Sequence, residues 1–343
     1  MKQLRIEESV GHVLCHDVTR IVRGEFKGAQ FRKGHIIRAE DIPMLLSMGK
    51  EHVYVWEATP GTLHENEAAL RLCALCRNEH MSAGEVREGK IELTADCAGL
   101  FRVDSQRLFQ VNMQDELMIA TRRGGSAVEA GDKLAGMRVI PLVIEESKLA
   151  EAERLAGKAP LLELLPYKLK TVGAVITGSE VYHGRIQDAF TPVLEEKLAR
   201  FGMVLAARRV SDDGLENVAA AIASVRAEGV DVVFCTGGMS VDPDDNTSGA
   251  IRASGAKVVS YGAPVLPGAM FLLGYYDDGT PVMGLPGCVM YARATVFDLL
   301  LPFVAAGVRL TKPDVASLGD GGLCLGCSPC RYPICPFAGG PGR

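Results

Sequence analysis

Apolar runs alternate with amphipathic stretches along residues 167–308. Residues 172–176 form a short continuous apolar run, typical of a strand buried on both faces, and the apolar residues of 214–227 recur with helical spacing. The same analysis predicts, in chain order, helix 188–201, strand 203–207, strand 230–234, helix 247–253, strand 258–260, strand 281–283 and helix 291–303. This alternation predicts an α/β fold with a mostly parallel sheet covered by helices on both faces. Ligands then bind at the carboxyl ends of the strands.

The rest of the chain divides into three further segments. Residues 1–60 carry short apolar pairs between glycines and predict a small β-rich unit. Residues 61–166 predict an α+β unit and a linker, with a helix over 65–77 and strands near 91–93 and 117–120. Residues 309–343 hold seven Gly, five Pro and four Cys, so this tail cannot build a core of its own and needs a staple. We therefore expect domains at 1–60, 61–166, 167–308 and 309–343.

Composition narrows the possible functions. The 343 residues are 48% hydrophobic and 23% charged, which is ordinary for a globular protein. A net charge of -5 and an aromatic content of 6% argue against a nucleic-acid partner and against an anionic membrane surface. No apolar run reaches the roughly 20 residues that a membrane helix needs. The charged start of the chain does not resemble a signal peptide, so we expect a cytoplasmic protein.

Two glycine-containing turns directly follow predicted strands. The first is Thr177-Gly178-Ser179-Glu180, and the second is Thr236-Gly237-Gly238-Met239-Ser240. Glycines at such turns let backbone N–H groups approach an anion, and the hydroxyls add further donors. The alternative is that each glycine only makes a βα turn. Two such loops at one end of one sheet favour anion binding.

Carboxylates follow the second turn, at Asp242, Asp244 and Asp245. Like charges beside an anion-binding loop repel, and a Mg²⁺ ion between them would remove the conflict. The alternative is that Asp245 or Thr247 caps the next helix. The turns Ser211-Asp212-Asp213 and Gly284-Leu285-Pro286-Gly287 also end strands, and the Asp pair is equally suited to a helix cap.

From about Val172 to Pro302, the chain resembles the molybdopterin-binding domain shared by molybdopterin molybdenumtransferases and molybdopterin adenylyltransferases. The resemblance rests on the ordered set Thr177-Gly178-Ser179-Glu180, Gly184, Ile186, Asp212-Asp213, Thr236-Gly237-Gly238, Pro243-Asp244-Asp245-Asn246-Thr247, Pro267-Gly268 and Gly284-Leu285-Pro286-Gly287. It implies a three-layer α/β domain that holds the pterin and its phosphate. It also implies Mg²⁺, with either adenylylated molybdopterin and molybdate or molybdopterin and ATP as substrates.

The resemblance also implies site residues. Asp245 would be the acidic residue at the reaction centre, with Asp212 as the second catalytic carboxylate, and Asp242, Asp244 and Asp245 would hold the metal. The cofactor-binding residues would be Thr177, Gly178, Ser179, Glu180, Thr236, Gly237, Gly238, Ser240, Pro286 and Gly287. The family commonly dimerises through such domains, so a homodimer is expected.

The chain departs from the family pattern at several places. Cys288 stands where the family has Asn, Ala269 stands where it has Lys, and the family's Asp-Gly-Tyr segment is absent. No room for the transferases' C-terminal β-barrel is expected after Pro302. We expect a transferase that inserts molybdate into molybdopterin. The alternatives are a non-catalytic molybdopterin carrier serving a molybdoenzyme partner, and an α/β protein that binds another phosphorylated metabolite.

The C-terminal tail carries Cys324, Cys327, Cys330 and Cys335 within twelve residues. This spacing is close to a ferredoxin cluster run, with four residues instead of three before the last Cys, and four thiolates also suit tetrahedral Zn²⁺. We expect a [4Fe–4S] cluster or Zn²⁺ here, and the alternative is a redox-inert tail. A second set, Cys73, Cys76, His80 and Cys97, is better explained by core packing.

Overall fold

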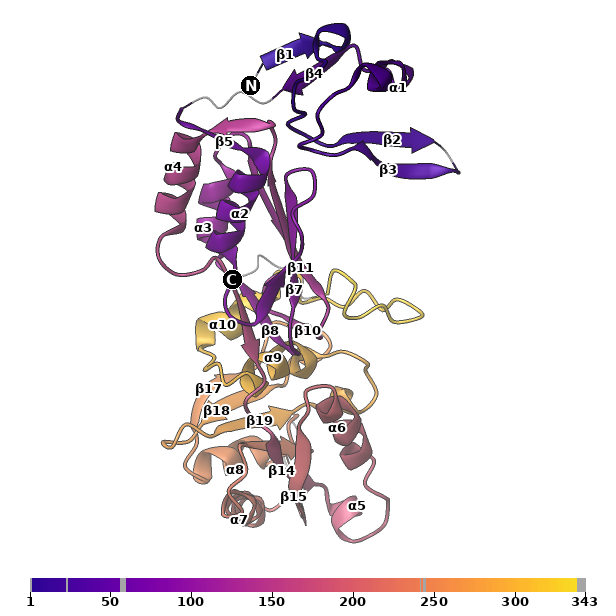
Figure 1. Cartoon of the computed structure of the whole chain (residues 1–343). Helices are drawn as coiled ribbons and strands as arrows, with labels where there is room; N and C mark the ends of the chain where they lie inside the picture. Colours follow the sequence, from indigo (N-terminus) through magenta and orange to yellow (C-terminus); the bar gives the residue numbers. More distant parts are fainter. Residues whose placement is uncertain (1, 23, 56–59, 241, 243–244, 338–343) are drawn as a thin grey trace. The chain divides into compact units, whose positions relative to one another are not determined.

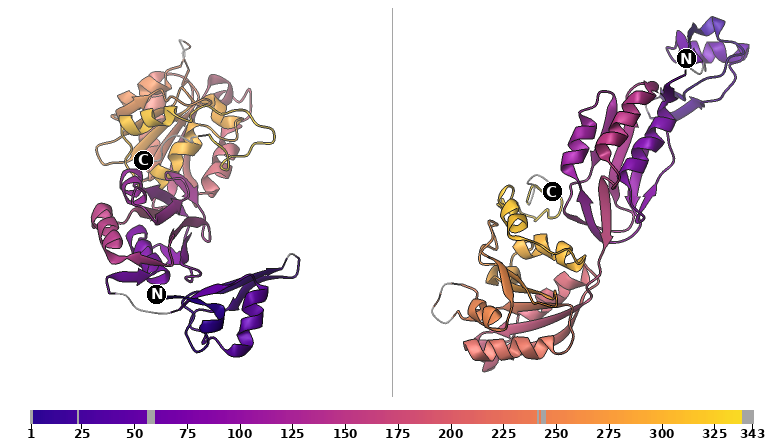
Figure 2. Two further views of the ribbon diagram at one scale, coloured as in Figure 1. Left: turned by 90° about the horizontal axis from the view of Figure 1, so that it is seen from above. Right: turned by 90° about the vertical axis from the view of Figure 1, so that its left-hand side faces the viewer.

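A computed structural model describes residues 2–22, 24–55, 60–240, 242 and 245–337, and the chain forms two compact units (Figure 1). Unit 1 comprises Met1–Thr94, Asp104–Arg122 and Asp132–Glu163. Unit 2 comprises Ala95–Val103, Arg123–Gly131 and Leu164–Arg343. Each unit is therefore assembled from three separate stretches of chain, which can be followed by colour in Figure 2.

Unit 1 begins with short strands and turns around a small core. Its elements up to residue 55 are β1 (Lys2–Arg5), η1 (Ile6–Glu8), β2 (Val18–Val22), β3 (Phe26–Phe31), η2 (Ala39–Asp41), α1 (Ile42–Ser47) and β4 (His52–Val55). Strand β1 pairs antiparallel with β4, and β2 with β3. Ile6, Leu14, Leu45 and Val53 are buried together between them. The predicted β-rich character of this segment is confirmed.

The remainder of unit 1 packs helices against a four-stranded sheet of order β6-β7-β11-β9. Its elements are β5 (Thr62–His64), α2 (Glu65–Cys76), β6 (Met81–Ala83), β7 (Lys90–Ala95), α3 (Ser105–Asn112), β9 (Leu117–Thr121), β11 (Lys133–Val139), β12 (Val143–Glu145) and α4 (Glu146–Ala156). Cys73 and Cys76 of α2 are 4% and 0% exposed, so their predicted role in core packing is confirmed.

Unit 2 is built on a six-stranded sheet of order β15-β14-β16-β19-β18-β17. The strands are β14 (Thr171–Thr177), β15 (Val204–Ser211), β16 (Val232–Thr236), β17 (Lys257–Tyr261), β18 (Leu272–Tyr275) and β19 (Pro281–Leu285). The first four in this order are mutually parallel, as predicted. Strand β18 is not predicted from the sequence, and it pairs antiparallel with both β19 and β17.

Helices cover both faces of this sheet. They are α5 (Ser179–Tyr182), α6 (Phe190–Ala199), α7 (Leu215–Arg226), α8 (Thr247–Ala253), η3 (Gly287–Met290), α9 (Val296–Ala305), α10 (Lys312–Ala316) and η4 (Ser317–Gly319). Side chains of α6 and α9 pack with Val172, Ala174 and Ile176, whereas those of α7 and α8 pack with Val175. Alternate residues of β14 thus face opposite layers, and the domain is a three-layer α/β fold.

The last long helix starts later than predicted. Residues 291–303 were expected to form it, but α9 begins at Val296. Thr295 caps the helix, because its hydroxyl accepts a hydrogen bond from Phe297 N at 3.2 Å while Asp298 accepts from Thr295 N at 2.8 Å. This capping box fixes the start of the helix.

A small three-stranded sheet contributes to the core of unit 2. It has the order β10-β8-β13, formed by β8 (Gly99–Val103), β10 (Ser126–Val128) and β13 (Leu162–Pro166). Leu100 is fully buried in the same core as α9, and Tyr167 donates a hydrogen bond to Gly99 O at 3.0 Å. In the described residues, no helix combines the length and the apolarity needed to cross a membrane.

Candidate functional site

The four parallel strands of unit 2 end at one edge of the sheet, and most of the predicted site residues follow directly after them. Pairing places Thr177 opposite Ser211, and Thr236 opposite both Ile176 and Leu285. The loops after β14, β15, β16 and β19 therefore leave the sheet side by side. This is the carboxyl edge, where ligands bind in open α/β sheets.

Hydroxyl groups connect two of these loops beneath the surface. Thr177 Oγ1 donates to Thr236 O at 3.1 Å and lies 3.3 Å from Thr247 Oγ1. Because each hydroxyl carries one hydrogen, Thr247 is then the donor in the second contact. Thr236 Oγ1 is buried and has no hydrogen-bond partner among the described residues. Buried polar groups without a partner are rare and mark positions that a water or ligand completes.

The second glycine turn has no room for side chains. Gly237 and Gly238 have φ angles of +84° and +54°. A Cβ at Gly237 would lie 2.4 Å from Thr177 O, and one at Gly238 would lie 2.7 Å from Thr247 Oγ1. These glycines are thus required by backbone conformation and by close packing against the neighbouring loop.

Asp213 joins three loops of the carboxyl edge. Its carboxylate accepts hydrogen bonds from both the backbone N and the hydroxyl of Ser179, each at 2.9 Å. Its carbonyl oxygen accepts from Asn246 Nδ2 at 3.0 Å. Asp213 is absent from the predicted site residues, which included its neighbour Asp212. The sequence signal was present, because both carboxylates follow the end of one strand.

The Asp212 carboxylate accepts hydrogen bonds at the start of α7. Its Oδ1 accepts from Gly214 N at 3.1 Å and from Asn217 Nδ2 at 2.8 Å. The N-cap residue of α7 is Gly214, which has no side-chain capping bond, so the capping role that the sequence left open for Asp212 is not found. Asp212 is half-buried at the edge of the sheet, so the structure places it at the candidate site with its carboxylate held by α7.

The acidic segment lies between Gly238 and the start of α8. Thr247 N donates to Gly238 O at 3.2 Å and closes the loop. Within it, Asp245 N donates to Asp242 O at 2.9 Å, and Asp242 N donates to Asp245 Oδ2 at 3.3 Å. The structure thus brings these two residues together. The predicted ligand Asp244 lies outside the described residues.

The other predicted residues lie at the same edge. Gly178, with φ +138°, precedes α5, and Glu180 and Ser240 are exposed. Pro286 is buried and Gly287 is exposed at the end of β19. Each of these residues lies shortly after the end of a strand.

The described carboxylates at this edge are Glu180, Asp212, Asp213, Asp242 and Asp245. Oxygen ligands of this kind suit Mg²⁺, which is bound through one or two carboxylates together with substrate phosphates. In the described ranges, no three such side chains converge into a metal cluster. A Mg²⁺ ion at this edge would need ligands from a bound phosphate in addition to these carboxylates.

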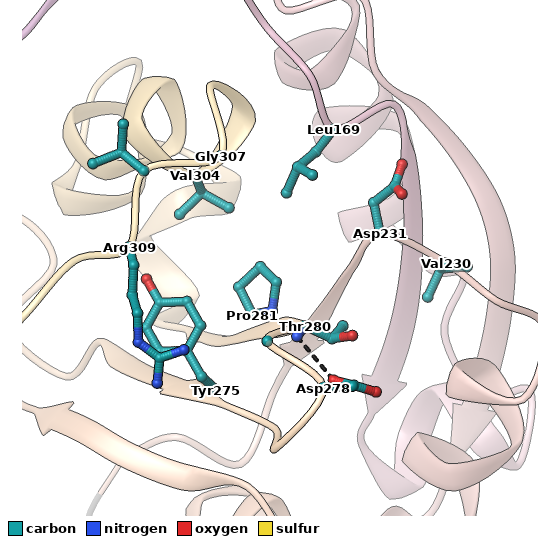
Figure 3. Close-up of a pocket in the computed structure, with 12 residues that line it drawn as sticks. Leu169, Val230, Asp231, Tyr275, Asp278, Thr280, Pro281, Val304, Gly307 and Arg309 are labelled. Atoms are coloured by element: carbon teal, nitrogen blue, oxygen red, sulfur yellow. Dashed lines mark hydrogen bonds between the residues drawn. The ribbon is translucent and has the colours of Figure 1, made fainter.

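A cavity of about 340 Å³ lies at the opposite, amino edge of the sheet (Figure 3). Its carboxylates are already engaged, because Asp231 accepts three hydrogen bonds from Lys170 and Thr171, and Asp278 accepts from Thr280 N at 2.9 Å. Arg309 stacks over the Tyr275 ring at 4.4 Å. This cavity contains none of the predicted site residues, so we assign the candidate site to the carboxyl edge.

The four cysteines of the tail lie in unit 2, apart from helices and strands. Cys324 and Cys335 are half-buried against the main core, and Cys327 and Cys330 are exposed. The described part of the chain holds no converged group of three metal-ligating side chains. The structure thus brings the first and last cysteine to the domain surface and leaves the middle pair in solvent.

Two segments match family models. Residues 173–306 match a family described as "Probable molybdopterin binding domain". Residues 3–57 match a family described as a domain of unknown function (DUF8806). The first match spans the six-stranded sheet of unit 2 and contains all of the glycine turns described above.

The chain is also similar to individual proteins. It is 34% identical to a CinA-like protein of Mycobacterium sp. (strain MCS) over 88 residues, covering 25% of this chain and 21% of that protein. The chain thus spans about a fifth of the length of the curated relatives it matches.

Two solved structures illustrate the structural similarity. The molybdopterin biosynthesis enzyme MoaB of Thermus thermophilus aligns with a TM-score of 0.36 at 22% identity, covering 40% of this chain and 92% of that one. The molybdopterin biosynthesis MoeA protein of Pyrococcus horikoshii aligns with a TM-score of 0.33 at 15% identity, covering 89% and 74%.

Proposed function

We propose, from the match of residues 173–306 to a family described as "Probable molybdopterin binding domain", that the chain acts in molybdenum cofactor biosynthesis. It binds molybdopterin, or its adenylylated form, at the carboxyl edge of the six-stranded sheet. There it inserts molybdate as a molybdopterin molybdotransferase does. The observation that carries the proposal is the joined set of loops around Thr177, Gly237 and Asp213, which builds a rigid cradle at the ligand edge of the domain.

The cradle supplies donors for a phosphate. Gly237 and Gly238 hold the backbone in the left-handed region, where successive N–H groups form an anion-binding concavity. Ser240 is exposed beside them and adds a hydroxyl. Pro286 and Gly287 line the neighbouring strand end, where the pterin would lie.

Asp245 and Asp242 would hold the Mg²⁺ ion, and Asp244 belongs to the proposed set by sequence. When bound, Mg²⁺ neutralises charge that develops on the phosphoryl oxygens as a phosphoanhydride is cleaved. The chain's own role is to hold the carboxylates in a closed loop, through Thr247 N and Gly238 O. Preorganised groups of this kind cost no reorganisation during the reaction.

Two substitutions favour a second candidate, a molybdopterin carrier without turnover. Ala269 offers only a methyl group where the family has a cation, and Cys288 replaces an amide with a thiol. Burial raises the pKa of the Cys288 thiol, which keeps it neutral and unreactive. A carrier would deliver its ligand to a molybdoenzyme partner. In either case we propose a homodimer and a metal centre, [4Fe–4S] or Zn²⁺, at the C-terminal cysteines.

Anaerobic equilibrium binding and turnover test the proposal on the full chain. We expect wild-type protein to bind molybdopterin and to convert adenylylated molybdopterin when molybdate and Mg²⁺ are present. Asp245→Asn should bind molybdopterin within about threefold of wild type but lose about 10²-fold or more in turnover, as losing a charge-stabilising group does. Asp277→Asn, an exposed carboxylate paired with Lys257 outside the cradle, is the matched control and should change neither.

The outcomes separate the candidates. Binding without turnover in the wild type would select the carrier. If the protein bound no form of molybdopterin, both candidates would fail and the binding of another phosphorylated metabolite would remain.

A further inference from the structure

The C-terminal tail is attached to unit 2 at its base. Leu266 N donates to Gly322 O, and Cys324 N donates to Leu266 O, both at 2.8 Å, so residues 322–324 run parallel to Leu266 as a short bridge. Gly322 is buried, and a Cβ there would lie 2.4 Å from Pro264 O. The chain is therefore tightly fitted where it reaches the first cysteine.

A second attachment lies beyond the third cysteine. Tyr332 donates its hydroxyl to Asp298 O on α9 at 3.2 Å, and its ring meets Phe337 edge-on with centroids 6.2 Å apart. Phe337 is 5% exposed and belongs to the main core of the unit. Cys335 lies between these two anchors and packs against the same core.

The exposed cysteines lie on the short loop between the attachments. Residues 325–331 connect Cys324 to Tyr332, and this loop carries Cys327 and Cys330. Because both ends are fixed, closing the loop onto a metal requires ordering only these few residues. Most of the entropy of bringing four ligands together has already been lost in folding the domain.

Apolar side chains around the cysteines are exposed. Leu323, Leu325 and Ile334 have 62%, 75% and 86% of their surface in contact with solvent. These three side chains place apolar surface in the sequence around the cysteines. Around thiolate metal centres, an apolar shell of this kind limits solvent access. The surroundings of the cysteines thus suit a loaded centre better than an open loop.

We propose that Cys324, Cys327, Cys330 and Cys335 together ligate one thiolate metal centre on the surface of unit 2. The two domain-held cysteines provide a fixed half-site, and the loop 325–331 folds onto the metal to supply the other two thiolates. Thiolates are soft ligands that select Zn²⁺ or iron–sulfur clusters. The metal content of this site can be measured without any molybdopterin.

Metal analysis of the anaerobically purified full chain is the direct test. We expect either one Zn²⁺ per chain in colourless protein, or about four iron with sulfide and a broad visible absorption band. Protein purified empty is reconstituted with Zn²⁺ or with ferrous iron and sulfide. The variant C327S/C330S should lose at least about tenfold of the metal. Cys97→Ser, a half-buried cysteine outside the tail, is the control and should keep it.

Tryptic cleavage gives a second readout. Arg331 is exposed in the loop. The preceding basic residue, Lys312, is followed by Pro313 and resists trypsin, so cleavage after Arg331 gives a fragment that is distinguished by mass from cleavage after Arg309. Loaded wild-type protein should be cut after Arg331 at least about fivefold more slowly than chelator-treated protein, because metal binding orders the loop. C327S/C330S should be cut at one rate under both conditions.

Two results would overturn the proposal. One is a wild-type chain that takes up neither metal after reconstitution. The other is full metal content in C327S/C330S. Neither result bears on the cradle, because molybdopterin binding is measured separately on the same preparations.

Discussion

Gly237 shows how closely the two glycine turns of unit 2 approach each other. Replacing it by alanine puts a methyl group 2.4 Å from Thr177 O in a backbone held at φ +84°. Gly255 has a similar φ of +94°, but nothing lies within 4 Å of its would-be Cβ, so it is a matched control. Gly255→Ala should cost roughly 1–2 kcal/mol of backbone strain.

Gly237→Ala should destabilise unit 2 by about 1–3 kcal/mol more than the control, because a methyl group is forced into a packed site. Urea unfolding of both variants, followed by circular dichroism, measures the difference. Equal destabilisation would show that the loops separate easily and that the cradle is not rigid.

Asp231 gives unit 2 a pH-dependent stability. Burial by itself raises the pKa of Asp231, but hydrogen bonds from Lys170 N, Thr171 N and the Thr171 hydroxyl, each at 2.8 Å, hold the pKa below its usual value. A lowered folded-state pKa contributes stability above the unfolded pKa of about 3.9, and this contribution is lost as the pH falls through the folded value.

The variant Asp231→Ala should therefore be about 1.5–3 kcal/mol less stable at pH 7, since it loses hydrogen bonds to a charged acceptor. The difference in unfolding free energy between wild type and Asp231→Ala should become steadily smaller from pH 5 to pH 2. Urea titrations at several pH values check this, with Asp277→Asn as the reference. A difference that stayed constant with pH would mean that the pKa of Asp231 is the same in the folded and the unfolded states.

At the residue scale, the sequence predicted which loops form the candidate site better than what each side chain does. Thr177 and Gly237 were predictable because each directly follows a buried strand of a parallel sheet. The roles of Asp212 and Asp213 were not, because adjacent carboxylates in one turn differ only in direction. That direction is decided by Asn217 on α7 for Asp212 and by Ser179 on α5, which is distant in sequence, for Asp213.

Among the elements, α6 and α9 are joined by a buried ion pair. Lys197 Nζ lies 2.7 Å from Asp298 Oδ1, the two side chains are 10% and 5% exposed, and Lys197 also donates to Arg293 O at 3.1 Å. Asp298 at the same time caps α9 through Thr295 N. The pair thus fixes the start of α9 to its neighbouring helix.

Lys197→Met should lower the free energy of unfolding by about 3–5 kcal/mol, because it leaves a buried carboxylate without its counter-charge. Lys257→Met removes an ion pair with Asp277 whose side chains are 75% and 78% exposed, and it should change stability little. Chemical unfolding of the two variants provides the comparison. A small effect at Lys197 would indicate that water or another cation reaches Asp298.

Helices and strands with a strong local pattern were predictable, and those defined by distant partners were not. The apolar run 172–176 predicts a strand and the helical spacing of 215–226 predicts a helix, and both elements are present. Strand β18 contains Gly274 and is set by its antiparallel pairing with β17 and β19. Residues 99–103 become β8 because β10 and β13, encoded further along, provide its partners.

For the whole molecule, the interleaved units make a specific prediction about fragments. Residues 164–343 contain the six-stranded sheet but lack Ala95–Val103 and Arg123–Gly131. Without them, the main core loses Leu100, and Tyr167 loses its acceptor at Gly99 O. The fragment 164–343 should therefore bind a hydrophobic dye and show lost near-ultraviolet circular dichroism, as loosely packed states do.

The fragment 95–343 restores both stretches and is the matched comparison. It should recover the near-ultraviolet signal of unit 2. Native-like packing of the shorter fragment would show that unit 2 packs without the three-stranded sheet β10-β8-β13.

Because unit 2 is assembled from three separate stretches of chain, its parts are synthesised at different times. Residues 95–103 leave the exit tunnel long before the strands of the six-stranded sheet have been made, because β19 and α9 end at Leu285 and Ala305. The fully buried Leu100 shares its core with residues such as Leu285 and Leu300, which are synthesised nearly two hundred residues later. Chains that still lack these partners expose apolar surface and unpaired strand edges, so nascent protein should depend on chaperones more than a chain whose domains follow one another in sequence.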